Sequence, residues 1–197
     1  MLVFLVGVVS FFAGKGAHIG EIQLGTSLGK VEKLVGDSAV RNAANRALAI
    51  DYVFLTAYWA AFVVLAALLA RRGGAWVVVA VLAAAMATAA ATLDIVENVR
   101  TTDVLAVHHP LGKNQLDALR HVSMLKWGAA ATTVGLLAGV FAQRGKIAVI
   151  ALLMLVVAGI GLAGTEWHCL IQVYELSVGG LTVLIGALLL ARPDVVR

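Results

Sequence analysis

Charged residues are scarce in this sequence. Asp, Glu, Lys and Arg make up 13% of its 197 residues, whereas a soluble domain carries about 25%. Hydrophobic residues account for 61%, and the mean hydropathy is +0.96. This composition excludes an ordinary soluble domain and predicts an integral membrane protein, for which a single domain over residues 1–197 is the natural organisation.

The sequence also lacks the motifs of several common chemistries. Its one cysteine, Cys169, excludes an internal disulfide framework and any CxxC metal or redox motif. There is no GxSxG, phosphate-binding loop, dinucleotide-binding fingerprint or HExxH motif. The net charge is +4, but the basic residues form no patch interleaved with aromatics, so we expect no nucleic-acid partner. The five histidines fall at expected helix ends and in loops, so we expect no metal site, and no cofactor can be named.

Long uncharged runs predict the membrane spans. Five of them are close to the roughly 20 residues that a helix needs to cross the hydrocarbon core, once their polar ends are added, and the run at residues 1–14 is shorter. Backbone groups in lipid must be paired within the segment, so the predicted fold class is all-α, a polytopic transmembrane helical bundle of about six spans. The first run lacks the basic n-region of a signal peptide, so we interpret it as a retained span. The spans are 1–14, 51–72, 74–100, 119–143, 146–165 and 166–192.

Residues 15–50 separate the first two predicted spans and have an amphipathic pattern. Apolar residues recur there at helical spacing: Leu28, Val31, Leu34 and Val35. We predict an interfacial amphipathic helix that rests on the lipid headgroups, and the alternative is a lid over the polar end of the bundle. Asp37 or Ser38 is expected to cap the helix that leads into the second span.

Charged residues are distributed unequally between the two ends of the predicted bundle. The tight turns at 71–74 and 144–146 and the tail after residue 191 are short and rich in Lys and Arg. The positive-inside rule therefore predicts a multi-pass protein of the cell membrane with cytoplasmic N- and C-termini. Ten of the eleven carboxylates, all five histidines and the cysteine then belong to the extracytoplasmic end.

Several polar residues are expected at one depth near that end. Because a helix rises about 1.5 Å per residue, Asp51 and Asp94 are expected about 30 Å from the tight turns. Lys126 and Glu175 are expected about 26 Å from them. The candidate ligand-binding residues are Asp51, Tyr58, Asp94, Glu97, Asn98, Arg120, Lys126 and Glu175.

These residues allow two compatible interpretations. The spacing of Asp94, Glu97 and Asn98 places them on one helix face. Acids opposite Lys126 and Arg120 form either an ion-pair network that fastens the helices together, or a polar pocket. Such a pocket would hold a charged or zwitterionic group or relay protons.

Three functions are compatible with such a site. The leading hypothesis is binding or transport of a polar or amphipathic small molecule or lipid, in a polar pocket near the extracytoplasmic interface. The second is a membrane-embedded enzyme acting on a lipid-soluble substrate, with Glu97 or Glu175 as general acid/base. The third is a homo-oligomer or an accessory subunit of a larger membrane complex, because small residues such as Gly135 and Gly139 allow close helix packing. The lipid bilayer is the partner common to all three.

Three short motifs resemble those of a group of small uncharacterised bacterial polytopic membrane proteins. Those proteins show Asp-aromatic-x-Phe-x-x-x-Tyr, then Asp-x-x-Glu-Asn, then Lys-Trp. The resemblance covers roughly residues 18–137, and it implies the same choice of polar residues and no particular activity. The matching residues are Asp51, Tyr52, Phe54, Tyr58, Asp94, Glu97, Asn98, Lys126 and Trp127.

Overall fold

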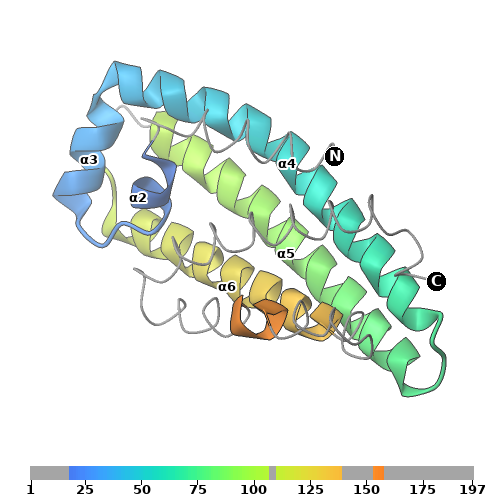
Figure 1. Ribbon diagram of the computed structural model, residues 1–197. Coiled ribbons are helices and arrows are strands. Elements are labelled where there is room, and N and C mark those ends of the chain that lie inside the picture. The colour runs from blue at the N-terminus through green and yellow to red at the C-terminus, as the bar shows by residue number, and fades with distance from the viewer. Residues whose placement is uncertain (1–17, 107–109, 139–152, 158–197) are drawn as a thin grey trace.

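The computed structural model describes residues 18–106, 110–138 and 153–157, and these are almost entirely helical (Figure 1). No strand occurs in these ranges, so the all-α prediction is confirmed for them. Successive long helices run in opposite directions, and the middle one packs against both others. The elements are α2 (Ile19–Gln23), α3 (Leu28–Gly36), α4 (Ser38–Ala70), α5 (Ala75–Ala106) and α6 (Lys113–Leu137).

Within the described ranges, α4 and α5 are the helices that are long and apolar enough to cross a membrane. They have 33 and 32 residues, and each contains an apolar stretch of the length that the hydrocarbon core requires. The number of spans stays a prediction. The predicted spans 1–14 and 166–192, and most of 146–165, lie outside the described residues.

The three long helices continue beyond the predicted spans at their polar ends. α4 begins at Ser38, as expected from a cap at Asp37 or Ser38, and so starts before the predicted span 51–72; α5 continues past residue 100 to Ala106. α6 begins at Lys113 rather than at residue 119. A charged residue ends an uncharged run but not a helix, because Arg, Lys and Glu have helix propensities close to that of leucine.

Local signals define both ends of α4. The Asp37 side chain accepts hydrogen bonds from the backbone N–H groups of Ala39 (2.8 Å) and Val40 (3.4 Å), which are otherwise unpaired at a helix start. Asp37 is one of the two residues expected to cap this helix. After Ala70 the chain reverses at Gly73 and Gly74, whose φ angles of 72° and 56° favour glycine.

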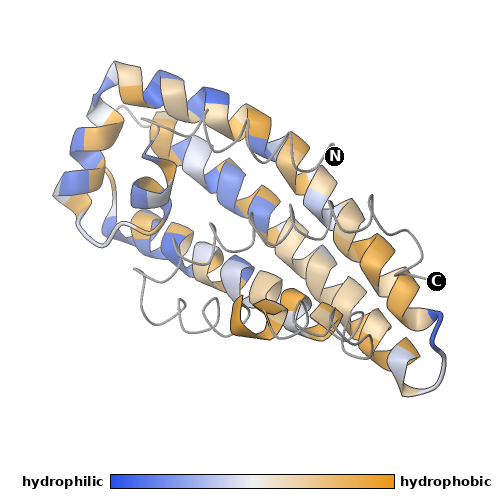
Figure 2. Cartoon of the chain, viewed as in Figure 1, coloured by the Kyte–Doolittle hydropathy of each residue, from blue (hydrophilic) through white to orange (hydrophobic). Residues whose placement is uncertain are grey.

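Two apolar cores lie at opposite ends of the bundle. Figure 2 shows hydrophobic residues predominating toward the turn between α4 and α5, and hydrophilic residues gathering toward α2 and α3. The turn-end core contains Leu65, Ala66, Leu69, Ala80, Ala83, Ala131, Val134, Leu137, Ala138, Met154 and Val157. The cap-end core contains Ile22, Val31, Val35, Ala44, Ala47, Leu48, Val104, Leu105, Leu111, Leu116 and Leu119.

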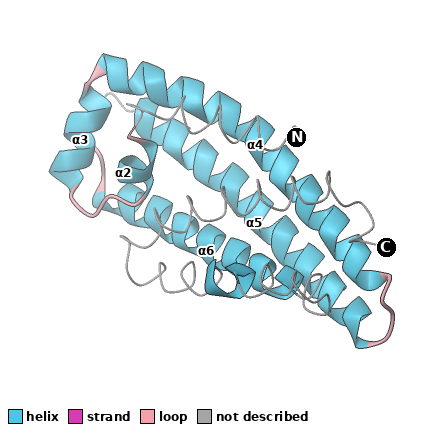
Figure 3. Ribbon diagram, in the orientation of Figure 1, coloured by secondary structure: helices cyan, strands magenta, loops and turns pink. Residues whose placement is uncertain are grey.

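The short helices α2 and α3 cover the cap end of the three long helices (Figure 3). The apolar face of α3, with Val31 and Val35, is buried in the cap-end core together with residues from α4, α5 and α6. In the described residues this segment therefore covers the polar end of the long helices, and its contact with lipid headgroups stays a prediction. Residues 18–50 form α2, α3 and the first turns of α4, in agreement with the helical spacing from Leu28 to Val35 and with a new helix after Asp37.

We call α2 and α3 together the cap, and polar contacts hold them in place. The Glu32 side chain accepts a hydrogen bond from the backbone N–H of Leu111 at 3.0 Å, which ties α3 to the start of α6. Lys30 of α3 pairs with Glu21 of α2 at 2.8 Å and thereby joins the two helices, and His18 at the start of α2 pairs with the same carboxylate at 2.9 Å. Two hydrogen bonds lower the pKa of the Glu21 carboxyl group. The one from Lys30 has the larger effect, and the one from His18 has the smaller.

The connection between α2 and α3 depends on a glycine. A Cβ atom on Gly25 would lie 2.5 Å from Val31 Cγ2 and 2.7 Å from the backbone oxygen of Glu21. We expect Gly25→Ala to lower the unfolding free energy by about 1–3 kcal/mol through this overpacking. Gly29→Ala is the matched control, because nothing lies within 4 Å of its Cβ position and alanine favours the helix. Thermal unfolding in detergent compares them, and equal midpoints would contradict the close approach at Gly25.

Candidate functional site

A group of polar side chains is buried where α4, α5 and α6 meet, between the two apolar cores. We call it the polar cluster. On α5 the i, i+3, i+4 spacing puts its members on the face that packs against the neighbouring helices. On α4 the two members are seven residues apart, and so share a face. The cluster consists of Asp51, Tyr58, Asp94, Glu97, Asn98 and Lys126.

Lys126 is the centre of the cluster. Its Nζ atom donates to Asp94 Oδ1 at 3.3 Å and to Glu97 Oε2, so one ammonium group from α6 bridges two carboxylates on α5. Relative exposure is 9% for Lys126, 5% for Asp94 and 0% for Glu97. Charges buried to this degree are stable only when they are paired and hydrogen-bonded. The Lys126 ammonium also lies 4.6 Å from the centre of the Trp127 ring, within range of a cation–π contact.

Two hydrogen bonds connect α4 to the polar residues of α5. The hydroxyl of Tyr58 donates to Asp94 Oδ2 at 2.9 Å, so both oxygens of Asp94 are bonded. The amide of Asn98 donates to Asp51 Oδ2 at 2.7 Å. Asp51 and Tyr58 are part-buried, in contrast to the α5 residues. The cluster therefore reaches from the interior of the bundle toward one side of α4.

A second set of polar groups lies between the cluster and the cap. Thr101 donates through Oγ1 to the backbone oxygen of Glu97 at 2.8 Å, and accepts from the Gln23 amide at 3.2 Å. Ser123 donates to the backbone oxygen of Leu119 at 3.1 Å, and its hydroxyl makes a longer contact of 3.5 Å with the backbone oxygen of Gln23. Through Gln23, helix α2 is bonded to both α5 and α6 directly beside the cluster. The sequence analysis singled out neither Thr101 nor Gln23; the i+4 spacing of Thr101 from Glu97 is a signal that could have found it, and Gln23 has no such signal.

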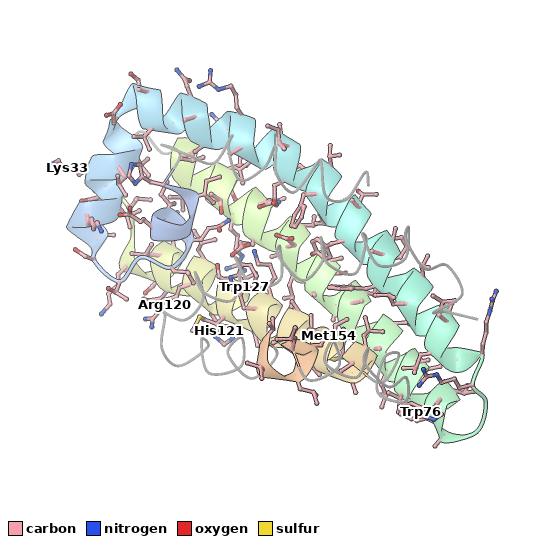
Figure 4. All side chains as sticks on the ribbon, viewed as in Figure 1. Lys33, Trp76, Arg120, His121, Trp127 and Met154 are labelled. Atoms are coloured by element: carbon pink, nitrogen blue, oxygen red, sulfur yellow. The ribbon has the colours of Figure 1, made fainter. Side chains whose placement is uncertain are left out.

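The structure places the remaining candidate residues elsewhere. Arg120 is half-buried, and Figure 4 shows it on the outer side of α6, away from α5. Its six-residue separation from Lys126 puts the two side chains about 120° apart around the helix. Trp127, by contrast, lies near the middle of the bundle in the same view. Glu175 lies outside the described residues.

One atom of the cluster stands out. Glu97 Oε1 is buried and has no hydrogen-bond partner among the described residues. Buried polar atoms in native proteins are nearly always bonded, so an exception calls for an explanation. Across the described ranges, no group of three or more His, Cys, Asp or Glu residues is placed to hold a metal ion.

An open cleft of about 340 Å³ lies nearer the cap, between α5 and α6. It is lined by Arg100, Asp103, Val104, Asn114, Gln115 and Ala118. None of these residues belongs to the polar cluster, and the sequence had not marked them. The chemical groups concentrated in the cluster are therefore separate from this cleft.

The pairing of Lys126 with the two carboxylates can be tested by replacing the lysine. Lys126→Met leaves Asp94 and Glu97 buried without their partner, so we expect the unfolding free energy to fall by about 3–5 kcal/mol. Lys113→Met, at an exposed position of the same helix, is the control and should change it by less than about 0.5 kcal/mol. Thermal unfolding in one detergent measures both.

The double variant Lys126→Met with Glu97→Gln supplies a second readout. It removes a buried charge together with its partner, so part of the stability lost in Lys126→Met should return. Equal unfolding midpoints for Lys126→Met and Lys113→Met would show that the lysine is not paired inside the bundle.

The chain matches no model of a known protein family, no curated protein and no solved structure. Its function therefore has to be inferred from the polar cluster itself. The relevant features are three carboxylates, one ammonium, a phenol and an amide, brought together from three helices.

Proposed function

We propose that this is a multi-pass protein of the cell membrane that binds or transports a polar or amphipathic small molecule, or a lipid, at the polar cluster. In this proposal the cluster lies near the extracytoplasmic interface, and the N- and C-termini are cytoplasmic. The observation that carries it is the burial of Asp94, Glu97 and Lys126 between two apolar cores. Ionisable groups inside a membrane bundle are rare and typically mark a ligand or ion path.

The membrane location is supported by the outer surface of the long helices. Val53 and Val64 on α4 are 56% and 58% exposed in the described part of the chain, and Val81 on α5 is 62% exposed. Large apolar side chains exposed along the length of a helix are suited to contact with acyl chains. An aqueous environment would leave a large apolar surface in water.

The proposed orientation is supported by the turn between α4 and α5. The Arg72 guanidinium lies 5.6 Å from the centre of the Trp76 ring, and Arg71 precedes it. Figure 4 shows Trp76 at this end of the bundle. Tryptophan and arginine are typical of a membrane–water interface, and arginine in short loops favours the cytoplasmic side. The polar cluster then belongs toward the opposite face of the membrane.

The packing of the three helices does not require a charged cluster. Replacing a buried ion pair by apolar side chains of similar volume is often neutral or stabilising, so such a pair is weak evidence of a stabilising role. Apolar cores already join the three helices on both sides of the cluster. Retaining charged groups between these cores therefore supports a role in binding rather than in assembly alone.

The surroundings of Tyr58 favour an amphipathic ligand. The ring of Tyr58 lies 5.5 Å from that of Phe54 and 5.8 Å from that of Phe62, measured between centroids. These half-buried aromatic rings follow one side of α4, and the middle one, that of Tyr58, carries the hydroxyl that bonds to Asp94. Apolar surface next to a few well-placed polar groups is the usual composition of a small-molecule site.

Native mass spectrometry of the protein released from native-membrane nanodiscs tests the proposal. We expect a co-purified small molecule or lipid on the wild-type protein. Tyr58→Phe and Asp94→Asn each remove one polar partner, so each should weaken its binding by about tenfold or more. Asp103→Asn is the matched control on α5, because Asp103 is exposed and outside the cluster. It should retain wild-type occupancy.

Circular dichroism on the same samples separates loss of ligand from loss of fold. A folded Asp94→Asn variant with wild-type occupancy, or a wild-type protein that carries no ligand, would contradict binding at the cluster.

A further inference from the structure

The open cleft between α5 and α6 has the composition of a ligand site. Its volume is about 340 Å³, and it shares no residue with the polar cluster. Its apolar residues are Val104, which is buried, and Ala118, which is half-buried. Apolar surface together with a few convergent polar groups is typical of small-molecule sites. The polar residues that line the cleft are exposed: Arg100, Asp103, Asn114 and Gln115.

Three side chains of the cleft can donate hydrogen bonds to a ligand. Asp103 lies one turn from Arg100 on α5, but the two form no ion pair, and the Arg100 guanidinium has no other partner among the described residues. The side-chain amide of Asn114 is likewise unbonded within these ranges. Gln115 Oε1 accepts the backbone N–H of Gly112 at 3.1 Å, which leaves the NH2 group of Gln115 for a ligand.

These donors are suited to an oxyanion. A guanidinium group binds phosphate through paired N–H groups, and amide NH2 groups can bond to the remaining oxygens. Asn114 and Gln115 also belong to the first turn of α6, where the partial positive charge of the helix N-terminus adds to the attraction. Asp103 contributes one negative charge to the cleft, so a singly charged phosphodiester is favoured over a more highly charged anion.

The surface that continues from the cleft is apolar. Val96 and Val99 lie one turn away on α5, and both are exposed. Leu125 is also exposed and lies seven residues after Ala118, hence on the same face of α6. Because α5 and α6 are antiparallel, these residues lead from the cleft toward the apolar turn end (Figure 2). In the proposed orientation, the cleft itself lies at the depth of the lipid headgroups.

We propose that this cleft binds the phosphate group of a membrane phospholipid, whose acyl chains lie along the exposed apolar surface of α5 and α6. Arg100, Asn114 and Gln115 donate hydrogen bonds to the phosphate oxygens. This is a second site, and it depends on the proposed membrane location but not on ligand binding at the polar cluster. Inorganic phosphate shares the oxyanion, but it has no apolar part to contact the valines and the leucine. The phospholipid is therefore the occupant that fits both features.

Lipid binding in detergent tests the phosphate contact. Native mass spectrometry of the full-length protein compares dioleoylphosphatidylethanolamine with dioleoylglycerol, which has the same acyl chains and no phosphate. We expect the phospholipid to bind the wild-type protein about tenfold more tightly, and Arg100→Gln to lose about that factor. Arg46→Gln is the matched control and should keep wild-type affinity, because Arg46 is an exposed arginine near the start of α4 and does not line the cleft.

A second variant fills the cleft without removing a charge. Ala118→Trp should exclude the phospholipid although Arg100 is retained, and Ala49→Trp, at an exposed alanine of α4, should bind it as the wild-type protein does. Circular dichroism confirms that each variant is folded, so either cleft variant alone keeps the proposal testable. Equal weakening by Arg100→Gln and Arg46→Gln, or wild-type binding by Ala118→Trp, would overturn the site.

Photolabelling locates the acyl chains. A phosphatidylethanolamine with a diazirine group on one acyl chain is irradiated with the protein in nanodiscs, and peptide mass spectrometry locates the adducts. We expect adducts in the peptides that contain Val96, Val99 or Leu125, and several-fold fewer of them in Arg100→Gln. Labelling of these peptides that is the same in both proteins would show that no headgroup is held in the cleft.

Competition with inorganic phosphate identifies the source of the oxyanion. Millimolar sodium phosphate should leave the bound phospholipid in place, as should sodium chloride at the same ionic strength. Displacement by phosphate but not by chloride would assign the cleft to a soluble phosphate compound and overturn the lipid.

The cleft and the polar cluster can fail separately. Tyr58→Phe and Asp94→Asn leave the cleft residues in place, so they should keep the phospholipid that Arg100→Gln loses. Arg100→Gln should in turn keep the molecule bound at the cluster. A phospholipid that is lost in Tyr58→Phe but retained in Arg100→Gln would overturn the cleft site and keep the proposed function. A protein whose co-purified molecules all depend on Arg100 and not on Tyr58 would keep the cleft site and contradict binding at the cluster.

Discussion

The contact of Lys126 with Asp94 and Glu97 is the interaction on which the rest of the site depends. It joins α6 to α5 between the two apolar cores, and Lys126 bonds to both carboxylates. Tyr58 bonds from α4 to one oxygen of Asp94, and Lys126 bonds from α6 to the other, so this carboxylate connects all three helices. Because an unpaired buried charge is strongly destabilising, these residues have to act as a unit.

The position of this unit between two apolar cores explains the architecture of the described part. The turn-end core packs small residues such as Ala83 and Ala131, which lets α5 and α6 approach closely. The cap-end core is built from larger residues and is covered by α2 and α3. Gln23 links this cap to Thr101 and hence to the backbone of Glu97. The cap and the cluster are thus mechanically connected, and the cluster is shielded on its cap side.

The sequence predicted the helical class and much of the cluster, because both depend on regular periodicity. Helical spacing placed Asp94, Glu97 and Asn98 on one face, and counting along each span placed Asp51 and Lys126 at a similar depth. Depth alone does not fix the direction of a side chain around its helix. Arg120 was therefore grouped with residues from which it points away (Figure 4).

Other features depend on contacts between distant segments, which periodicity does not encode. Gln23 reaches Thr101 because α2 folds back over the cap end, and nothing in the local sequence specifies this return. The break between α2 and α3 involves a close approach of Gly25 to Val31, which local spacing does not reveal, whereas the Asp37 cap between α3 and α4 could be read from the sequence. Periodicity also gives no sign that Glu97 Oε1 is buried without a hydrogen-bond partner. This follows only from the positions of the described residues around it.

An experimental density map of the protein in a lipid nanodisc, resolved at the level of side chains, is the most direct test of this account. It should show the Lys126 ammonium between Asp94 and Glu97, with further density for a bound group beside Glu97 Oε1. A map in which Lys126 points into the acyl chains would contradict the account. So would a Glu97 carboxylate fully bonded to protein groups, with no space for a ligand.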